Sequence, residues 1–167
     1  MVCPHLTRVG RIPGLALLAA LLYPELACLY LHRRHKILRL RRHRWCGHLY
    51  YLLSVYLLGN DISPDADIGA RVRFPHPVSI VIGGNARIGT RTTVFSHVCI
   101  GTNSAARHRY EYPRIGADVY VGTGAIVIGG VAIGRSSVIG AGAVVRSDIP
   151  SNVVCVGVPA RVLSPSL

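Results

Sequence analysis

A six-residue spacing of large apolar side chains constrains this chain more than any other feature of its sequence. The spacing is carried by Ile62, Ile68, Phe74, Ile82, Ile88, Val94, Ile100, Ile115, Val121, Val127, Ile133, Ile139 and Val145. A period of six fits neither an amphipathic helix nor a simple alternating strand. It predicts short strands and tight turns, with three repeats per coil and coils stacked about 4.8 Å apart through parallel ladders. Thirteen anchors predict a mainly β solenoid of a little over four coils.

Two breaks interrupt this repeat. Phe74 and Ile82 are eight residues apart, so two extra residues distort the coil beside His76. Ile100 and Ile115 are fifteen residues apart, which predicts a protruding loop at residues 101–114. Interruptions of a solenoid usually lie on one functional face. A tolerated surface insertion would give the same spacing.

A basic and partly apolar segment precedes the repeat. Residues 14–31 look like a membrane or signal segment, but Pro24 would kink a helix there and Glu25 would be costly in lipid. We therefore expect two packed helices near residues 14–31 and 45–59, with peripheral membrane attachment left open. The predicted organisation is a helical segment at 1–60, a β-helix at 61–163 and a short tail at 164–167.

The formal net charge of +12 is unevenly distributed along the chain. Residues 1–60 hold nine of the 19 Lys and Arg against one acid, and seven of the nine lie in residues 31–45. This stretch predicts either a solvated helix face or attraction to anionic lipid or a phosphorylated carrier. Nucleic acid is not an expected partner, because no aromatic platform or groove-reading motif accompanies the charge.

The five cysteines are odd in number and include no CxxC pair. This pattern argues against a disulfide framework and against a structural zinc site. It is typical of reduced thiols in a cytoplasmic protein.

Two stretches resemble a known family, the hexapeptide-repeat acyltransferases. They are GNDISPDADIGARVRFPHPVSIVIGGNARIG at residues 59–89 and PRIGADVYVGTGAIVIGGVAIGRSSVIGAGAVV at residues 113–145, followed by VGVPARV at 156–162. Within that family the chain resembles the serine acetyltransferase branch and its colanic-acid-type, polysaccharide-modifying relatives. The resemblance implies a left-handed parallel β-helix that assembles as a homotrimer.

The resemblance also implies a reaction, the transfer of an acetyl group from acetyl-CoA to a hydroxyl. His76 stands where the family has its catalytic histidine, and a neutral imidazole suits a general base near neutral pH. Asp61 lies fifteen residues earlier, as in serine acetyltransferases. Its carboxylate would orient the imidazole and stabilise the imidazolium that forms.

Residues for acetyl-CoA are carried over from the same resemblance. Backbone amides of glycine-rich turns would line a groove between subunits and hold the pantetheine arm. Arg135 would lie at the nucleotide end, where it and Arg161 could pair with phosphates. The turn residues implied for the pantetheine arm are Gly101, Gly122, Thr123, Gly124 and Ala141.

The acceptor side departs from serine acetyltransferases. Pro75 replaces an aspartate before the catalytic histidine, and residues 110–113 read Tyr-Glu-Tyr-Pro instead of Asp-Arg-His-Pro. Without that arginine a carboxylate loses its bidentate partner, which favours another hydroxyl acceptor, most naturally a sugar that stacks on Tyr110 and Tyr112. His97, one coil after His76, would either position the acceptor or be a partly buried polar residue at a subunit seam.

These observations predict a cytoplasmic O-acetyltransferase that acts on a saccharide in polysaccharide biosynthesis, with membrane association left open. One alternative is a serine O-acetyltransferase of cysteine biosynthesis, and another is a non-catalytic trimeric scaffold. A gamma-class carbonic anhydrase would need several histidine ligands for zinc at coil spacing. His76 and His97 do not make that set, so no metal is expected.

Overall fold

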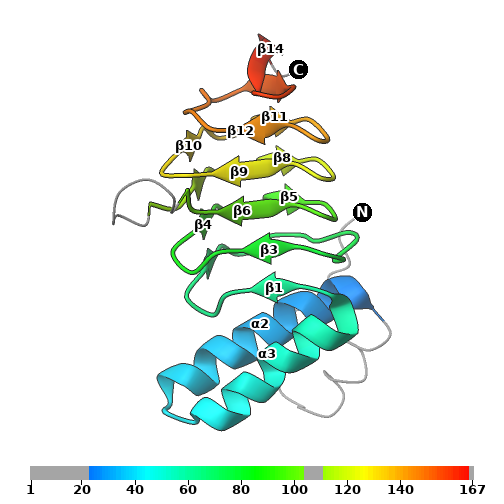
Figure 1. The fold of residues 1–167 in the computed structure, drawn as a ribbon, viewed down its shortest axis with the longest axis vertical. Coiled ribbons are helices and arrows are strands. Elements are labelled where there is room, and N and C mark those ends of the chain that lie inside the picture. The colour runs from blue at the N-terminus through cyan, green and yellow to red at the C-terminus, as the bar shows by residue number, and fades with distance from the viewer. Residues whose placement is uncertain (1–22, 104–110, 166–167) are drawn as a thin grey trace.

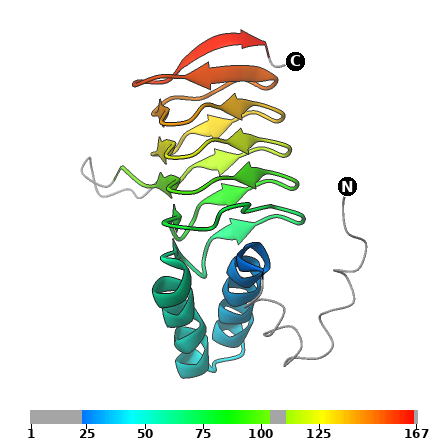
Figure 2. The ribbon, with the colours of Figure 1, turned by 90° about the vertical axis from the view of Figure 1, so that its right-hand side faces the viewer.

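The computed structural model describes residues 23–103 and 111–165. Two antiparallel helices lie at one end of a stack of coils, and the last strand lies at the other end (Figures 1 and 2). The N-terminal part of the expected first helix, residues 14–22, lies outside the described residues, as do residues 104–110 of the expected loop and residues 166–167 of the tail.

The first described helix begins at a proline. Helix α2 spans Pro24–Leu40, with Pro24 in its first turn, where a fixed φ and a missing N–H do no harm. The expected first helix, near residues 14–31, extends further than predicted, because α2 continues to Leu40. Helix α3 spans Arg44–Leu58, close to the predicted 45–59, and ends at Gly59 with a left-handed φ of 63°.

Three parallel sheets form the walls of the solenoid. The first sheet contains β1 (Asp61–Ile62), β3 (Val81–Ile82), β6 (Cys99–Gly101), β9 (Ile126–Ile128) and β12 (Val144–Val145). The second contains β2 (Asp67–Ile68), β4 (Arg87–Ile88), β7 (Arg114–Ile115) and β10 (Ala132–Ile133). The third contains β5 (Thr93–Val94), β8 (Tyr120–Val121), β11 (Val138–Ile139), β13 (Val153–Val156) and β14 (Arg161–Pro165). Among the described strands β14 alone pairs antiparallel, and it closes the end of the stack.

The predicted anchors form the core. All thirteen lie in it except Ile68, which is partly buried and packs against it. The stack extends further than predicted, because the first sheet has five strands, one for each turn of the chain. Val145 begins the fifth turn, and Ile149 and Cys155 are its other inward residues. The period missed them because Ile149 follows Val145 by four residues instead of six.

Helix α2 covers the open end of the core. Its buried residues are Ala27, Cys28, Leu31, His32 and His35, and Cys28 belongs to the same apolar cluster as the first coil. Lys36 and Arg39 reach the first coil, where Lys36 Nζ donates to the Ala66 carbonyl at 3.2 Å and Arg39 pairs with Asp65 at 2.9 Å. The helical hairpin is therefore packed against the base of the solenoid. None of the helices in the described part of the chain is both long enough and apolar enough to cross a membrane.

Candidate functional site

One edge of the solenoid carries His76 and most of the residues expected to hold acetyl-CoA. Turns that join the third sheet to the first stack on this edge at residues 75–80, 95–98, 122–125 and 140–143, and we call them the His76 corner. Backbone bonds of 2.9–3.0 Å join successive turns: His97 N to Val78 O, Gly124 N to Ser96 O, and Gly142 N to Thr123 O. The corner is therefore a continuous column from the first coil to the fourth.

His76 lies on the enlarged turn at the base of this column. Phe74, just before it, is fully buried, and the chain then needs two more residues than the next coil to reach the first sheet. The Val78 N–H closes a tight turn by donating to the His76 carbonyl at 2.8 Å. The His76 side chain is exposed, as a group that must reach a bound substrate has to be.

An aromatic pair that sequence reasoning missed lies beside His76. The Phe95 ring lies 6.2 Å from the His76 imidazole, centroid to centroid, and 4.9 Å from the Tyr120 ring. Phe95 directly follows β5 and Tyr120 begins β8, so they lie on successive coils, and neither side chain belongs to the buried core. Outward aromatic residues one coil apart are the signal in the sequence that could have found them.

Asp61 lies at the start of β1 with its side chain exposed. Its Oδ1 accepts a hydrogen bond from the Tyr51 hydroxyl at 3.0 Å. Burial, and then this bond, raise the pKa of Tyr51, so the phenol stays protonated and able to donate. No hydrogen bond joins Asp61 to His76 among the described residues, so within one chain the carboxylate is held from helix α3.

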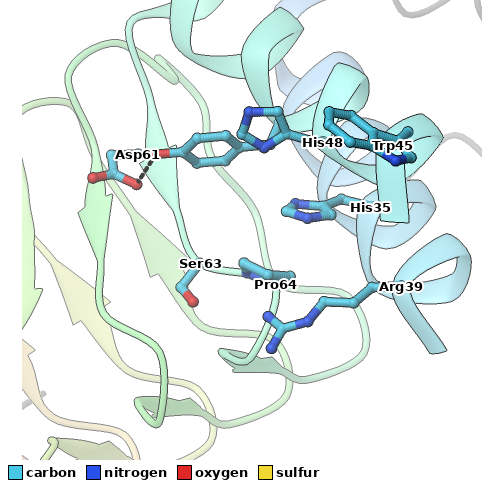
Figure 3. A pocket seen from close by; sticks show the side chains of 8 residues that line it. His35, Arg39, Trp45, His48, Asp61, Ser63 and Pro64 are labelled. Carbon is cyan, nitrogen blue, oxygen red and sulfur yellow. Dashed lines mark hydrogen bonds between the residues drawn. The ribbon is translucent and has the colours of Figure 1, made fainter. Parts of the chain in front are cut away.

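A pocket of about 670 Å³ opens beside Asp61, between the helices and the first coil. In Figure 3, His35, Arg39, Trp45 and His48 approach it from the helices, and Asp61, Ser63 and Pro64 from the coil. His48 stacks on Tyr51 with their ring centroids 5.8 Å apart. Sequence reasoning missed these helical residues, because only the packing of the hairpin brings them to Asp61.

Two of the three expected acceptor-binding residues, His97 and Tyr112, are described and lie on different edges of the solenoid. His97 is exposed at the His76 corner with a φ of 60°, but its ring makes no contact with that of His76. Tyr112 is half-buried and lies over Gly83, where a β-carbon would come within 2.5 Å of its ring. Tyr110 lies outside the described residues.

Four of the expected acetyl-CoA residues, Gly122, Thr123, Gly124 and Ala141, lie together on the His76 corner. The N–H groups of Thr123 and Ala141 donate to nothing in the described chain, so two free amides lie one coil apart. Gly124 has a φ of 70°, and a β-carbon there would meet only Gly142 N at 3.9 Å. Gly122 has a packing role as well, because a β-carbon there would come within 2.7 Å of Ala141 N.

The other three donor-site residues lie elsewhere. Gly101 ends β6 on the first sheet, with open space where a β-carbon would be. Arg135 is exposed on the turn between β10 and β11, which is a different edge of the solenoid from the His76 corner. Arg161 begins β14, directly after Ala160, whose N–H donates to Val144 O at 2.8 Å. Arg161 is therefore close to the upper end of the column.

Within residues 23–103 and 111–165, no three His, Cys, Asp or Glu side chains gather closely enough to hold a metal ion. Cys28, Cys46, Cys99 and Cys155 are free thiols.

Known proteins that resemble this chain are hexapeptide-repeat transferases. Residues 112–147 match the family described as bacterial transferase hexapeptide (six repeats). The chain is 35% identical over 143 residues to the serine acetyltransferase of Bacillus subtilis, covering 86% of this chain and 65% of that protein. It is 33% identical over 144 residues to the serine acetyltransferase of Helicobacter pylori strain J99, covering 86% of this chain and 84% of that protein.

A solved structure shares the fold. The serine acetyltransferase of Brucella abortus in complex with coenzyme A superposes with a TM-score of 0.79 at 27% identity, covering 83% of this chain and 55% of that one. These comparisons support the serine acetyltransferase branch, and they do not support the expected resemblance to polysaccharide-modifying acetyltransferases. The chain spans about two thirds of the length of the Bacillus relative.

Proposed function

Because this chain belongs to the hexapeptide-repeat transferase family that includes the serine acetyltransferases, we propose that it transfers an acetyl group from acetyl-CoA to a hydroxyl. The observation that carries the proposal is the His76 corner. It places an exposed imidazole at the base of a column in which the Thr123 and Ala141 amides are free to bind a ligand.

In the proposed reaction His76 is the general base. Its imidazole takes the proton of the acceptor hydroxyl as that oxygen attacks the thioester carbonyl of acetyl-CoA. The carbon–sulfur bond breaks, the acetyl group stays on the oxygen, and the thiolate of CoA receives the proton from the imidazolium. Asp61 stabilises the imidazolium, in the manner of an orienting carboxylate.

The donor site of this proposal follows the column. The pantetheine arm lies along Thr123, Gly124 and Ala141, and the free amides of Thr123 and Ala141 donate to its carbonyl groups. A second subunit of a homotrimer supplies the other wall, and Arg135 or Arg161 meets the phosphates. The proposal also includes the handedness of the family, so the coils of this solenoid are taken to be left-handed.

Serine is the acceptor that the relatives favour, since the proteins compared above are named for it. A saccharide is the second candidate, for two reasons on the acceptor side. The chain has Glu111 where the family's carboxylate-binding arginine would stand. The pocket beside Asp61 also presents the rings of Trp45 and His48, which could stack on a sugar.

The acceptor assay tests this function directly. Release of CoA thiol from acetyl-CoA is measured with L-serine and with a panel of nucleotide sugars and oligosaccharides. We expect acceptor-dependent release with serine, and turnover of a sugar in its place would make the second candidate the better one. A folded protein that releases no thiol with any of these acceptors, or whose thiol release is the same without an acceptor, would overturn the proposal.

We also propose that the tip of the helical hairpin contacts anionic membrane surfaces from the cytoplasm. The tip lies at the end of the hairpin in Figure 2 and joins α2 to α3. Leu40 and Trp45 are 77% and 89% exposed there, and Arg41 and Arg42 between them are exposed and pair with no carboxylate among the described residues. Exposed apolar and basic side chains on one protrusion suit the interface of an anionic bilayer.

A charge-matched pair of variants tests this contact by sedimentation with phosphatidylglycerol vesicles. Near an anionic surface each basic residue contributes about 1 kcal/mol, so Arg41→Gln with Arg42→Gln should weaken binding about thirtyfold. The control removes the same charge from the second sheet, by Arg87→Gln with Arg114→Gln, and should bind like the wild type. Equal losses in both variants, or no binding by the wild type, would contradict the proposal.

A further inference from the structure

A buried asparagine holds the turn that carries His76. Asn60 is fully buried directly after the end of α3. Its Nδ2 donates to the Pro77 carbonyl at 2.7 Å, and its Oδ1 accepts from the Ile80 N–H at 2.9 Å. Pro77 follows His76 immediately, so both polar groups of the Asn60 side chain bond to the enlarged turn. This turn departs from the six-residue repeat.

The same residue is joined to both helices. Its own N–H donates to Ser54 O in α3 at 3.3 Å, and its Nδ2 lies 3.7 Å from Cys28 Sγ in α2. Burial raises the pKa of Cys28 to about 12, so the thiol stays neutral beside the amide. Asn60 is therefore fixed from the side of the helices, independently of the turn that it holds.

We propose that Asn60 is a positioning residue for the catalytic base, acting through the backbone of residues 77–80 to fix where His76 points. This inference rests on the proposed acetyl transfer. The His76 side chain itself is exposed, so the packing of the core does not orient it. A substitution of Asn60 that removed these two bonds would leave the Pro77 carbonyl and the Ile80 N–H without partners. The turn would then move so that these groups could form other hydrogen bonds. Small displacements of a reacting group cost large factors in rate.

The test compares two variants that remove similar bonds from different turns. Asn60→Leu keeps the approximate size of the side chain and removes both bonds. Thr92→Val is the control, because Thr92 is equally buried, donates to Gly116 O at 2.9 Å and accepts from Val119 N at 3.3 Å on a different edge of the solenoid. We expect Asn60→Leu to lower kcat by about tenfold to a hundredfold, with the KM for acetyl-CoA unchanged. Thr92→Val should lower the stability of the protein and leave kcat unchanged.

Two further measurements separate positioning from a structural role. In a His76→Ala background, Asn60→Leu should lower kcat no further, since it acts only through His76. Asn60→Asp keeps the shape of the side chain and is available should the leucine variant fail to fold. Its carboxylate cannot donate to Pro77 O, whereas its protonated form can, so its kcat relative to the wild type should rise as the pH falls.

The outcomes distinguish this inference from the proposed function. An active wild type whose kcat survives Asn60→Leu overturns the role of Asn60 alone, as does an equal loss in the His76→Ala background. A ratio of Asn60→Asp to wild-type kcat that does not change with pH also counts against it. A wild type that acetylates no acceptor overturns both proposals.

Discussion

Replacing His76 by alanine should lower kcat by about 10²–10⁴-fold, which is the usual contribution of a general base. The hydroxyl would then have to lose its proton to water as it attacks the thioester. Binding of acetyl-CoA should change little, because the free amides of Thr123 and Ala141 lie two and three coils above His76. Initial rates of thiol release at varied acetyl-CoA concentration separate kcat from KM.

The matched control is His43→Ala. His43 is also exposed, but it lies at the tip of the hairpin, far from the His76 corner. This variant should keep the wild-type kcat, and both variants should keep the wild-type unfolding midpoint because neither side chain is buried. Full activity in His76→Ala would favour the alternative of a non-catalytic scaffold.

The stability of the protein should fall by about 3 kcal/mol between pH 6.5 and pH 4 through one residue, His32. Burial, and then the charges of Lys36, His35 and Arg33, lower the pKa of His32 from 6.5 to about 4. The unfolded chain therefore binds more protons than the folded one in this window, so the free energy of unfolding rises with pH. The contribution is fully present above pH 6.5 and is lost as the pH falls towards 4.

Urea unfolding at several pH values measures this effect. His32→Leu removes the titrating group from a site that is only 5% exposed and whose Nδ1 has no hydrogen-bond partner in the part of the chain that the structure describes. It should flatten the dependence of the unfolding free energy on pH in the window. His43→Leu, at an exposed histidine, should leave the wild-type slope. An unchanged slope in His32→Leu would show that other groups carry the acid sensitivity.

Much of the fold was predictable because a solenoid repeats one local solution. Each repeat must send one large side chain inward, so the anchors from Ile62 to Val145 mark the core directly in the sequence. The last coil was not predicted, because Ile149 follows Val145 after four residues and so breaks the six-residue period. The start of α2 was not predicted either, because a proline inside an apolar run, such as Pro24, indicates a helix kink or a first helical turn equally well.

The candidate site was predictable where it depends on the repeat. His76 stands out because two extra residues accompany it, and the glycine-rich turns stand out because the same corner recurs in every coil. Tyr51 and Asn60 carry no such mark. Each acts across the boundary between the helices and the solenoid, and no spacing in the sequence predicts which helical residue meets which turn.

The sequence by itself therefore determined the solenoid, its inward residues and the position of His76 on a distorted turn, because those features follow from contacts between neighbouring repeats. Only the tertiary structure decided what surrounds the two catalytic candidates. The hairpin packs against the first coil, gives Asp61 its partner in Tyr51, and holds the His76 turn through Asn60. These are single contacts between non-repeating segments, set by how the helices dock, and so no periodic pattern encodes them.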